Sequence, residues 1–412
     1  MRKTDNPPLW RSSLGLITLV LLCLPALATP AADGTLIDAM DEVSFSAPKE
    51  KGQVELVPGK VGNALKFSFD KDCQSVMMIG RAAGKPEWDN AAGFSFWVKG
   101  DGSDHLGGLE FIWNGDYATR YAYAFPIRST EWKKIVVPWR DLIPELSKTT
   151  LSVAPKNGNA PSRLGPFTFG KWWYWRDYAA HSYTIDEIRL EPTIAQDDKE
   201  YRPAGAPLAR VLAKLKAGQP ITVVTMGDSL TDTAHWTNRE TNWPLQLKAQ
   251  IKQKYGSELT IVNPAMGGTE LRQNLVVLRR WADKTPEPDL VTVFFGGNDW
   301  NSGMRGDNFL AAQQDAVDRI RHATGGHADV LILTTCPPLE NSSLMNELAA
   351  ACRQAAKNKN AGICDISSAF QAIPQNDRAR LYATDKIHLG LPGQELVAQS
   401  VLSAISNTGS RQ

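Results

Sequence analysis

Cysteine is scarce in this chain, with five residues in 412. One of them, Cys23, lies in an apolar N-terminal run, and the other four are too few for a disulfide scaffold. They allow one bridge in an oxidising compartment, for which Cys352 with Cys364 is the expected pair. Histidine is also rare, with six residues. No cluster of His and Cys has the spacing of a zinc site, so the sequence predicts no catalytic metal.

An excess of either charge is absent as well. Lys and Arg number 45 against 44 Asp and Glu, a net charge of +1. The chain therefore lacks the excess of positive charge that attracts nucleic acid, and a nucleic-acid partner is not expected. The chain also lacks a Gly-rich phosphate loop with a Lys and a dinucleotide fingerprint. With 42% hydrophobic and 22% charged residues, the composition is that of a folded globular protein.

Long hydrophobic runs are limited to one stretch of about 14 residues, Leu14 to Leu27, which is shorter than a bilayer-spanning helix. Arg2, Lys3 and Arg11 precede it, and the small-residue site Ala26-Leu27-Ala28 ends it. This pattern predicts a cleaved secretory signal over residues 1–28, with an uncleaved anchor as the alternative. We therefore expect a periplasmic or extracellular protein without stable membrane insertion after cleavage.

The pattern of the chain changes near residue 200. Between residues 35 and 192, short alternating apolar runs are separated by Gly, Pro, Asn and Asp, which is typical of an antiparallel β-sandwich. From residue 220, β-rich and helical runs alternate five times, which predicts a five-stranded parallel sheet with helices on both faces. The polar, Pro-punctuated segment between them separates two domains. We predict a β-sandwich over 29–195, a linker and connecting helix over 196–218, and an α/β domain over 219–412.

Polar and glycine residues follow the predicted strands of the α/β domain, where active sites of open α/β sheets lie. The first strand ends in Gly227-Asp228-Ser229, the second in a loop with Gly267-Gly268, and the third in Gly296-Gly297-Asn298-Asp299. Paired glycines leave backbone amides unshielded, and the Asn298 amide can donate to a developing negative charge. Asp228 and Asp299 are interpreted as acceptors that organise their loops.

A serine nucleophile needs a base, and the base needs a partner that fixes its tautomer. Near the C-terminus, Asp385 and His388 stand three residues apart. Together with Ser229 they supply the three roles.

These segments, in this order, resemble the SGNH (GDSL) hydrolase family over roughly residues 219–406. The resemblance implies a flavodoxin-like fold, the catalytic triad Ser229, His388 and Asp385, and no required cofactor. It also implies an oxyanion hole formed by Ser229, Gly268 and Asn298. Gly268 is preferred to Gly267 because it stands five residues after Asn263, where the family glycine usually falls. The family often has Gly where this chain has Thr233.

The predicted sandwich domain holds eight of the 13 tryptophans: Trp88, Trp97, Trp113, Trp132, Trp139, Trp172, Trp173 and Trp175. Adjacent strand residues point to opposite faces, so some rings of the 172–175 cluster should meet solvent or a sugar. Trp173 and Trp175 are the candidates, and packing against the hydrolase domain is the alternative. The segments 94–102, 131–139 and 183–190 resemble jelly-roll domains of the carbohydrate-binding-module type. This resemblance makes a structural calcium possible, with ligands Asp38, Asp41 and Asp186.

The predicted function is that of a secreted serine esterase that removes short acyl groups, acetyl above all, from a carbohydrate or polysaccharide. Trp236 and Trp300 could wall the acyl pocket, with core or loop packing as the alternative. A lipid esterase or lysophospholipase and a sugar O-acyltransferase would use the same triad. A glycan-binding protein with a silent hydrolase domain is an alternative of another class.

Overall fold

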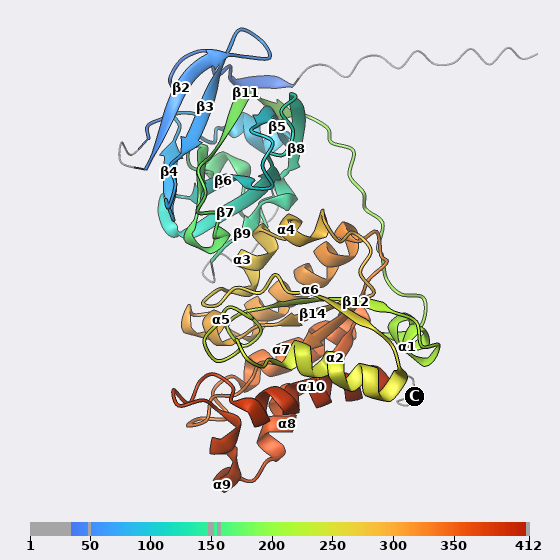
Figure 1. Ribbon diagram of the computed structural model, residues 1–412. Helices are drawn as coiled ribbons and strands as arrows, with labels where there is room; N and C mark the ends of the chain where they lie inside the picture. Colours follow the sequence, from blue (N-terminus) through green and yellow to red (C-terminus); the bar gives the residue numbers. More distant parts are fainter. Residues whose placement is uncertain (1–33, 48–50, 147–151, 155–157, 409–412) are drawn as a thin grey trace, which may run out of the picture. The chain divides into compact units, whose positions relative to one another are not determined.

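The computed structural model of the chain describes residues 34–47, 51–146, 152–154 and 158–408 (Figure 1). The predicted signal peptide, residues 1–28, lies outside the described residues. Within the described ranges, no helix is both long and apolar enough to cross a bilayer.

The first part of the chain folds into two antiparallel sheets, which confirms the predicted strand-rich N-terminal region. One sheet has the order β2-β3-β11-β5-β8, with β1 paired to β11, and the other has the order β4-β10-β6-β7-β9. The strands are β1 Thr35–Asp38, β2 Gly52–Pro58, β3 Asn63–Phe69, β4 Val76–Ile79, β5 Gly93–Gly100, β6 Leu106–Trp113, β7 Asp116–Pro126, β8 Lys133–Pro138, β9 Ile143–Pro144, β10 Thr168–Lys171 and β11 His181–Glu191.

Aromatic side chains fill the core that these two sheets share. Phe67 and Phe96 come from the first sheet, Phe125 and Phe169 come from the second, and all four are fully buried. The ring centroids of Phe67 and Phe169 are 5.0 Å apart, and those of Phe96 and Phe125 are 5.1 Å apart. Burial of each ring removes a large apolar area from water, and each Å² of buried apolar surface stabilises the folded state by about 25 cal/mol. The sheets are therefore held together by the side chains that alternation places inward.

Four short strands are not evident from the sequence. β1, β4 and β10 have four residues each, and β9 has two. Four residues are the shortest run over which alternation can be recognised, and β9 is shorter still. In addition, β9 ends in a proline and β10 contains Gly170.

The second part of the chain contains a five-stranded parallel sheet, as predicted. Its order, β13-β12-β14-β15-β16, is that of flavodoxin-like folds. Its strands are β12 Ile221–Gly227, β13 Leu259–Val262, β14 Leu290–Phe294, β15 Asp329–Leu333 and β16 Gly362–Cys364. Its helices are α1 Ala209–Lys216, α2 Trp243–Tyr255, α3 Leu271–Val276, α4 Arg279–Ala282, α5 Gly297–Asn301, α6 Gly306–Ala323, α7 Asn346–Lys359, α8 Ile366–Ala372, α9 Gln375–Arg378 and α10 Leu391–Ser406.

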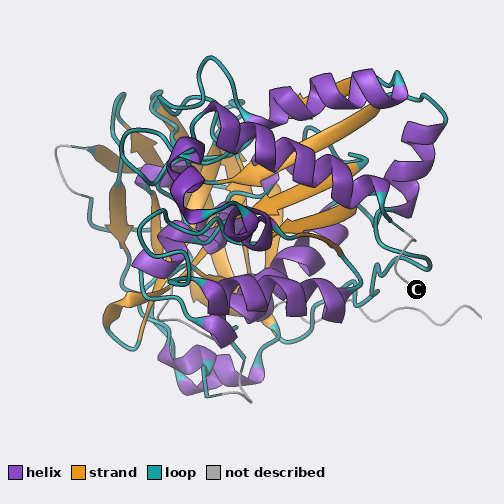
Figure 2. Ribbon diagram, turned by 90° about the horizontal axis from the view of Figure 1, so that it is seen from below, coloured by secondary structure: helices purple, strands orange, loops and turns teal. Residues whose placement is uncertain are grey.

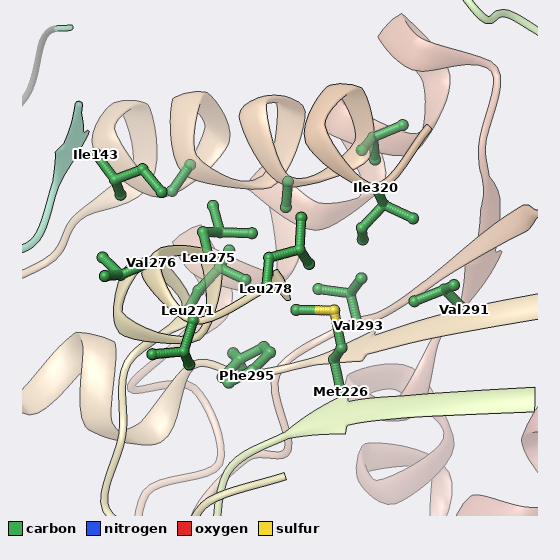
Figure 3. Close-up of a cluster of buried hydrophobic side chains, with 14 of the residues drawn as sticks. Ile143, Met226, Leu271, Leu275, Val276, Leu278, Val291, Val293, Phe295 and Ile320 are labelled. Atoms are coloured by element: carbon green, nitrogen blue, oxygen red, sulfur yellow. The ribbon is translucent and has the colours of Figure 1, made fainter. Parts of the chain in front are cut away.

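Helices cover both faces of this sheet (Figure 2). On one face, Met226 of β12 and Val293 of β14 pack with Ile320 of α6 (Figure 3). On the other face, Val223 of β12 belongs to the same cluster as Leu247 of α2. The strands are thus apolar on both sides, as expected for a buried parallel sheet.

Helix boundaries follow local signals in the sequence. α2 begins after Asn242, whose side chain accepts a hydrogen bond from the Leu245 amide at 3.1 Å, and Pro244 occupies its first turn. It ends at Gly256, which adopts a φ of 71°. The apolar run over 275–282 indicates one helix, but the structure has two short helices there, α3 and α4. A capping box between Glu270 and Gln273 starts α3 earlier than the apolar pattern indicates.

The predicted disulfide between Cys352 and Cys364 is wrong. Both cysteines, like Cys73 and Cys336, are free and buried. Cys352 belongs to the core on one face of the parallel sheet and Cys364 to the core on the other, so the sheet separates the two thiols. Burial raises the pKa of Cys352 to about 12 and also raises the pKa of Cys364, so neither thiol ionises readily at neutral pH.

The three carboxylates suggested as calcium ligands accept hydrogen bonds from the chain. Asp38 accepts from the Met40 amide at 2.8 Å, Asp41 from Asn63 at 2.7 Å, and Asp186 from Lys60 and Val61 at 2.7 and 2.9 Å. In the part of the chain that the structure describes, no group of three or more His, Cys, Asp or Glu residues is arranged to hold a metal ion. The predicted calcium ligands therefore do not form a common site.

Candidate active site

Ser229 lies two residues beyond the end of β12, at the carboxyl edge of the parallel sheet. The tight turn requires Gly227, because a Cβ there would lie 2.4 Å from Thr231 Oγ1. Asp228 organises this turn, as the sequence predicts. Its Oδ1 accepts a hydrogen bond from the Leu230 amide, and its carbonyl accepts one from Thr231, both at 3.0 Å.

His388 lies next to Ser229 and comes from the loop before α10. Its Nε2 lies 2.8 Å from Ser229 Oγ, and its Nδ1 lies 2.6 Å from Asp385 Oδ2. A proton on Nδ1 that is donated to Asp385 leaves the Nε2 lone pair facing the serine hydroxyl. The three residues therefore form one chain of hydrogen bonds that can remove a proton from Ser229.

The Asp385 carboxylate is stabilised in its ionised form. Desolvation acts to raise its pKa, but hydrogen bonds from the His388 ring and from the His388 and Ile387 amides outweigh it and lower the pKa to about 2. The amide bonds are 2.9 and 3.0 Å long. Asp385 is consequently charged at neutral pH and can stabilise a positive imidazolium next to it.

Two backbone amides in these loops, those of Ser229 and Gly268, have no hydrogen-bond acceptor among the described residues. The Gly267 amide, by contrast, donates to Asp232 Oδ2 at 2.8 Å. Gly268 adopts a φ of 80°, which favours glycine. The Gly267 N–H is therefore already bonded, whereas the Gly268 N–H is available to an acceptor from outside the described chain.

Asn298 lies in the first turn of α5, four residues beyond the end of β14. Its Nδ2 is 3.1 Å from the Thr269 carbonyl and 3.4 Å from Asp228 Oδ2. Because the second contact is long, this N–H can turn toward a stronger acceptor near Ser229. Gly296 permits the approach, since its φ is 146° and a Cβ there would lie 1.8 Å from Thr335 Cγ2.

The carboxyls of Asp228 and Asp299 are buried beneath these loops. The pKa of each is raised to about 7, mainly because desolvation disfavours the charged form, and for Asp299 the nearby Glu270 contributes to this increase. Asp299 Oδ1 accepts a hydrogen bond from the Leu271 amide at 3.1 Å and so ties the Asn298 loop to α3. Both residues act as loop organisers, as the sequence indicates.

Several residues near the serine carry no motif and were not predicted. Arg176, from the N-terminal part, pairs with the buried Asp232 at 3.1 Å. The His235 ring lies on the His388 ring with a centroid distance of 4.1 Å. Asp232 stands three residues after Ser229, and this closeness in the chain is the only local signal for it. Thr233, where the family often has Gly, is exposed and does not adopt a positive φ, so glycine is not needed there.

The tryptophans predicted to contact substrate fall into two groups. Trp175 is fully buried, so its predicted contact with substrate is wrong. It packs with Trp172 and Tyr174 in the cluster that contains Leu271, which corresponds to the alternative of packing against the hydrolase domain. Trp173 is 43% exposed, and its Cη2 would lie 3.7 Å from a Cβ on Gly268.

The other two predicted pocket tryptophans differ in the same way. Trp236 is 54% exposed, and its ring centroid lies 6.4 Å from that of His388. Trp300 is partly buried against the core beneath α6, with the Arg305 guanidinium 3.8 Å from its ring centroid. The exposed rings beside the serine are therefore Trp173, next to Gly268, and Trp236, next to His388.

Residues 225–396 match the GDSL-like lipase/acylhydrolase family. The C-terminal part of the chain is a GDSL/SGNH lipase-acylhydrolase domain. No curated protein sequence matches the chain.

Solved structures with similarity to this chain include three hydrolases. A lipase/acylhydrolase from Enterococcus faecalis is 21% identical, with 47% of this chain and 99% of that chain covered and a TM-score of 0.38. An acetylxylan esterase from Geobacillus stearothermophilus is 18% identical, with 46% and 96% covered and a TM-score of 0.37. An alpha/beta hydrolase from the metagenome of Lake Arreo, Spain, is 21% identical, with 45% and 94% covered and a TM-score of 0.38. The domain assignment rests on the family match and not on these likenesses.

Asp299→Asn is expected to flatten the pH dependence of stability. The folded-state pKa of Asp299 is raised to about 7, against about 3.9 in an unfolded chain. The folded state therefore binds more protons between these values, and stability falls as the pH rises from about 4 to about 7. The amide keeps the acceptor for Leu271 and has no charge to desolvate. The measurement is the free energy of unfolding in denaturant at pH 5 and at pH 8. Its decrease between these two pH values should be larger in the wild type than in the variant by about 2 to 3 kcal/mol. Equal losses in the two proteins would contradict the buried-carboxyl account.

Asn298→Ala is expected to lower kcat by about 10² to 10³ and to leave KM nearly unchanged. The reason is that a donor to the oxyanion is strongest when negative charge develops on the substrate oxygen. Steady-state kinetics on p-nitrophenyl acetate measure both constants. Asn301→Ala, an exposed change in the same helix, is the matched control and should leave both constants unaltered. A raised KM with normal kcat would instead make Asn298 a ground-state contact.

Proposed function

We propose that this chain is an exported serine esterase that removes short acyl groups, acetyl above all, from a carbohydrate. The single observation that carries the proposal is the hydrogen-bonded chain from Ser229 Oγ through His388 to Asp385. It lies beside two backbone amides with no acceptor in the described part of the chain. A nucleophile, a base, an ionised partner and an oxyanion site are the parts that acyl transfer needs.

In this mechanism, Ser229 Oγ attacks the ester carbonyl carbon while His388 Nε2 takes the serine proton. The amides of Ser229 and Gly268 and the Asn298 side chain hold the negative oxygen of the tetrahedral intermediate. The intermediate collapses as His388 returns the proton to the leaving alcohol, and an acyl group remains on Ser229. A water molecule, deprotonated by His388, then releases the carboxylic acid.

The exposed aromatic rings support a carbohydrate as the alcohol part of the ester. Trp173 and Trp236, 43% and 54% exposed, stand on the Gly268 side and the His388 side of Ser229. Flat rings suit the C–H faces of sugars, which are apolar, while the charged groups nearby can bind hydroxyls. A partner of this kind, an acetylated glycan, fits the two flanking rings.

The N-terminal part completes the proposal. We assign its two antiparallel sheets to a jelly-roll domain of the carbohydrate-binding type and residues 1–28 to a cleaved export signal, so that the enzyme works outside the cytoplasm. A long unbranched acyl chain is the main competing substrate. Ile387, in the histidine loop, is 64% exposed and favours this lipid-esterase alternative.

Ser229→Ala and His388→Ala are each expected to lower kcat by about 10³ to 10⁶ with folding intact, and Asp385→Ala by less. The serine variant removes the nucleophile and the histidine variant removes the base. Hydrolysis of p-nitrophenyl acetate measures the effect, and a thermal melt checks the fold. Thr233→Ala, which removes an exposed hydroxyl from the same loop, is the control. Near-normal turnover in Ser229→Ala would rule out the proposed mechanism.

The ratio kcat/KM on p-nitrophenyl esters is expected to fall steeply from acetate to butyrate and to be negligible for octanoate. An open apolar groove would gain up to ~0.8 kcal/mol for each added methylene. Walls formed by tryptophan rings close to Ser229 would instead make each methylene costly. A rate that rises through octanoate would favour the lipid-esterase alternative, for which Ile387 would line the acyl path.

A further inference from the structure

Arg176 links the N-terminal part of the chain to the candidate active site. It directly follows the 3-10 helix Trp173–Trp175 and reaches the loop after β13. Its Nη1 lies 3.1 Å from Asp232 Oδ2, and its Nη2 donates to the Gly267 carbonyl at 3.3 Å. Asp232 Oδ2 also accepts from the Gly267 amide at 2.8 Å. Both polar backbone groups of Gly267 are therefore held by one ion pair.

This clamp determines the direction of the next amide. The Gly267 carbonyl and the Gly268 N–H belong to the same peptide unit, and no peptide bond in the described residues is cis. In a trans peptide, the C=O and the N–H point in opposite directions. Because Arg176 holds the carbonyl on one side, the Gly268 N–H must point to the other side.

The clamped peptide is immediately next to the nucleophile. A Cβ on Gly267 would lie 3.5 Å from Ser229 Cβ, and a Cβ on Gly268 would lie 3.7 Å from Trp173 Cη2. Two consecutive glycines have unusual backbone freedom, so this peptide could otherwise rotate. Rotation would aim a carbonyl oxygen, rather than an N–H, at a developing negative charge.

Arg176 itself has an unusual backbone conformation. Its φ is 54°, in the left-handed region that favours Gly or Asn. An arginine there is unfavourable for the backbone, and such positions are often associated with function. The side chain is 34% exposed and makes charge-assisted hydrogen bonds with the acid and the carbonyl.

From these contacts we infer that Arg176 is a positioning residue that fixes the Gly268 amide toward the reacting oxygen. The N-terminal part thereby holds one donor of the oxyanion hole in place, although all the donors belong to the C-terminal part. This inference rests on the proposed function, because it assigns the Gly268 amide to the tetrahedral intermediate. It predicts an effect on kcat and not on substrate binding.

The test compares Arg176→Met with Arg128→Met in the full chain. Arg128 forms another ion pair between the two parts, with Asp283 at 3.3 Å. Arg279 also lies 3.5 Å from Asp283, so the control leaves that acid paired. We measure kcat and KM on p-nitrophenyl acetate and the thermal midpoint of each protein.

A second readout is the rate of reaction with a fluorophosphonate, which does not depend on the natural ester. Ser229 Oγ forms a bond to phosphorus, fluoride leaves, and the serine proton passes to His388. The negative phosphoryl oxygen of this reaction occupies the same oxyanion site.

Arg176→Met should lower kcat and the fluorophosphonate rate by about 10- to 100-fold with KM changed less than about twofold, a smaller loss than removal of a donor itself. Arg128→Met should keep all three constants within about twofold. Arg176→Lys, which retains a cation and one donor, should fall between wild type and Arg176→Met. This variant also carries the test if the methionine variant does not fold.

Three results would overturn the inference: unchanged kcat in the Arg176 variants, a raised KM with normal kcat, or an equal loss in Arg128→Met. Failure of the proposed function has a different signature. In that case the wild type itself would neither hydrolyse the ester through Ser229 nor react with the fluorophosphonate at that residue.

Discussion

The parallel alignment of β12, β13 and β14 is the constraint on which the candidate site depends. These strands are neighbours, so their carboxyl ends lie about 5 Å apart along one edge of the sheet. Ser229, Gly268 and Asn298 follow these three ends and therefore come together at this edge of the sheet. His388 is the exception. It comes from the loop before α10, and the pairing of Tyr382 with Leu389 holds the base of that loop.

The same edge of the sheet contains two carboxyl groups whose burial is electrostatically unfavourable. Asp228 and Asp299 are buried, and desolvation holds the pKa of each near 7. Each carboxyl accepts a backbone amide that would otherwise lack a partner: Asp228 accepts from Leu230 in the turn after β12, and Asp299 accepts from Leu271 at the start of α3. The two buried carboxyls therefore lower the free energy of unfolding as the pH rises toward 7. In return, their hydrogen bonds hold the loops rigid. This is a common exchange at sites that must present backbone donors in one orientation.

Much of this fold could be predicted because its signals are local or periodic. The five parallel strands and the bounds of α2 follow from apolar runs and from caps such as Asn242 and Gly256. The placement of Ser229 and Asn298 follows from strand ends. The buried state of Trp175 could not be predicted, because residues 173–175 form a 3-10 helix rather than a strand, and alternation does not apply. The separation of Cys352 from Cys364 likewise depends on which face of the sheet each residue joins.

The role of Arg176 could not be predicted from the sequence, for a more general reason. Its partners, Asp232 and Gly267, are 56 and 91 residues away and lie in the loops that follow β12 and β13. No spacing rule connects them. The 3-10 helix that buries Trp175 ends in the left-handed turn at Arg176, so the packing between domains and the clamp on Gly267 arise from one short segment. A hydrolase domain without residues 172–176 would expose the apolar surface around Leu271 and would also lose the clamp on Gly267. The N-terminal sheets and the parallel sheet are therefore parts of one compact unit, Gly34–Gln412, and not separate modules joined by a linker.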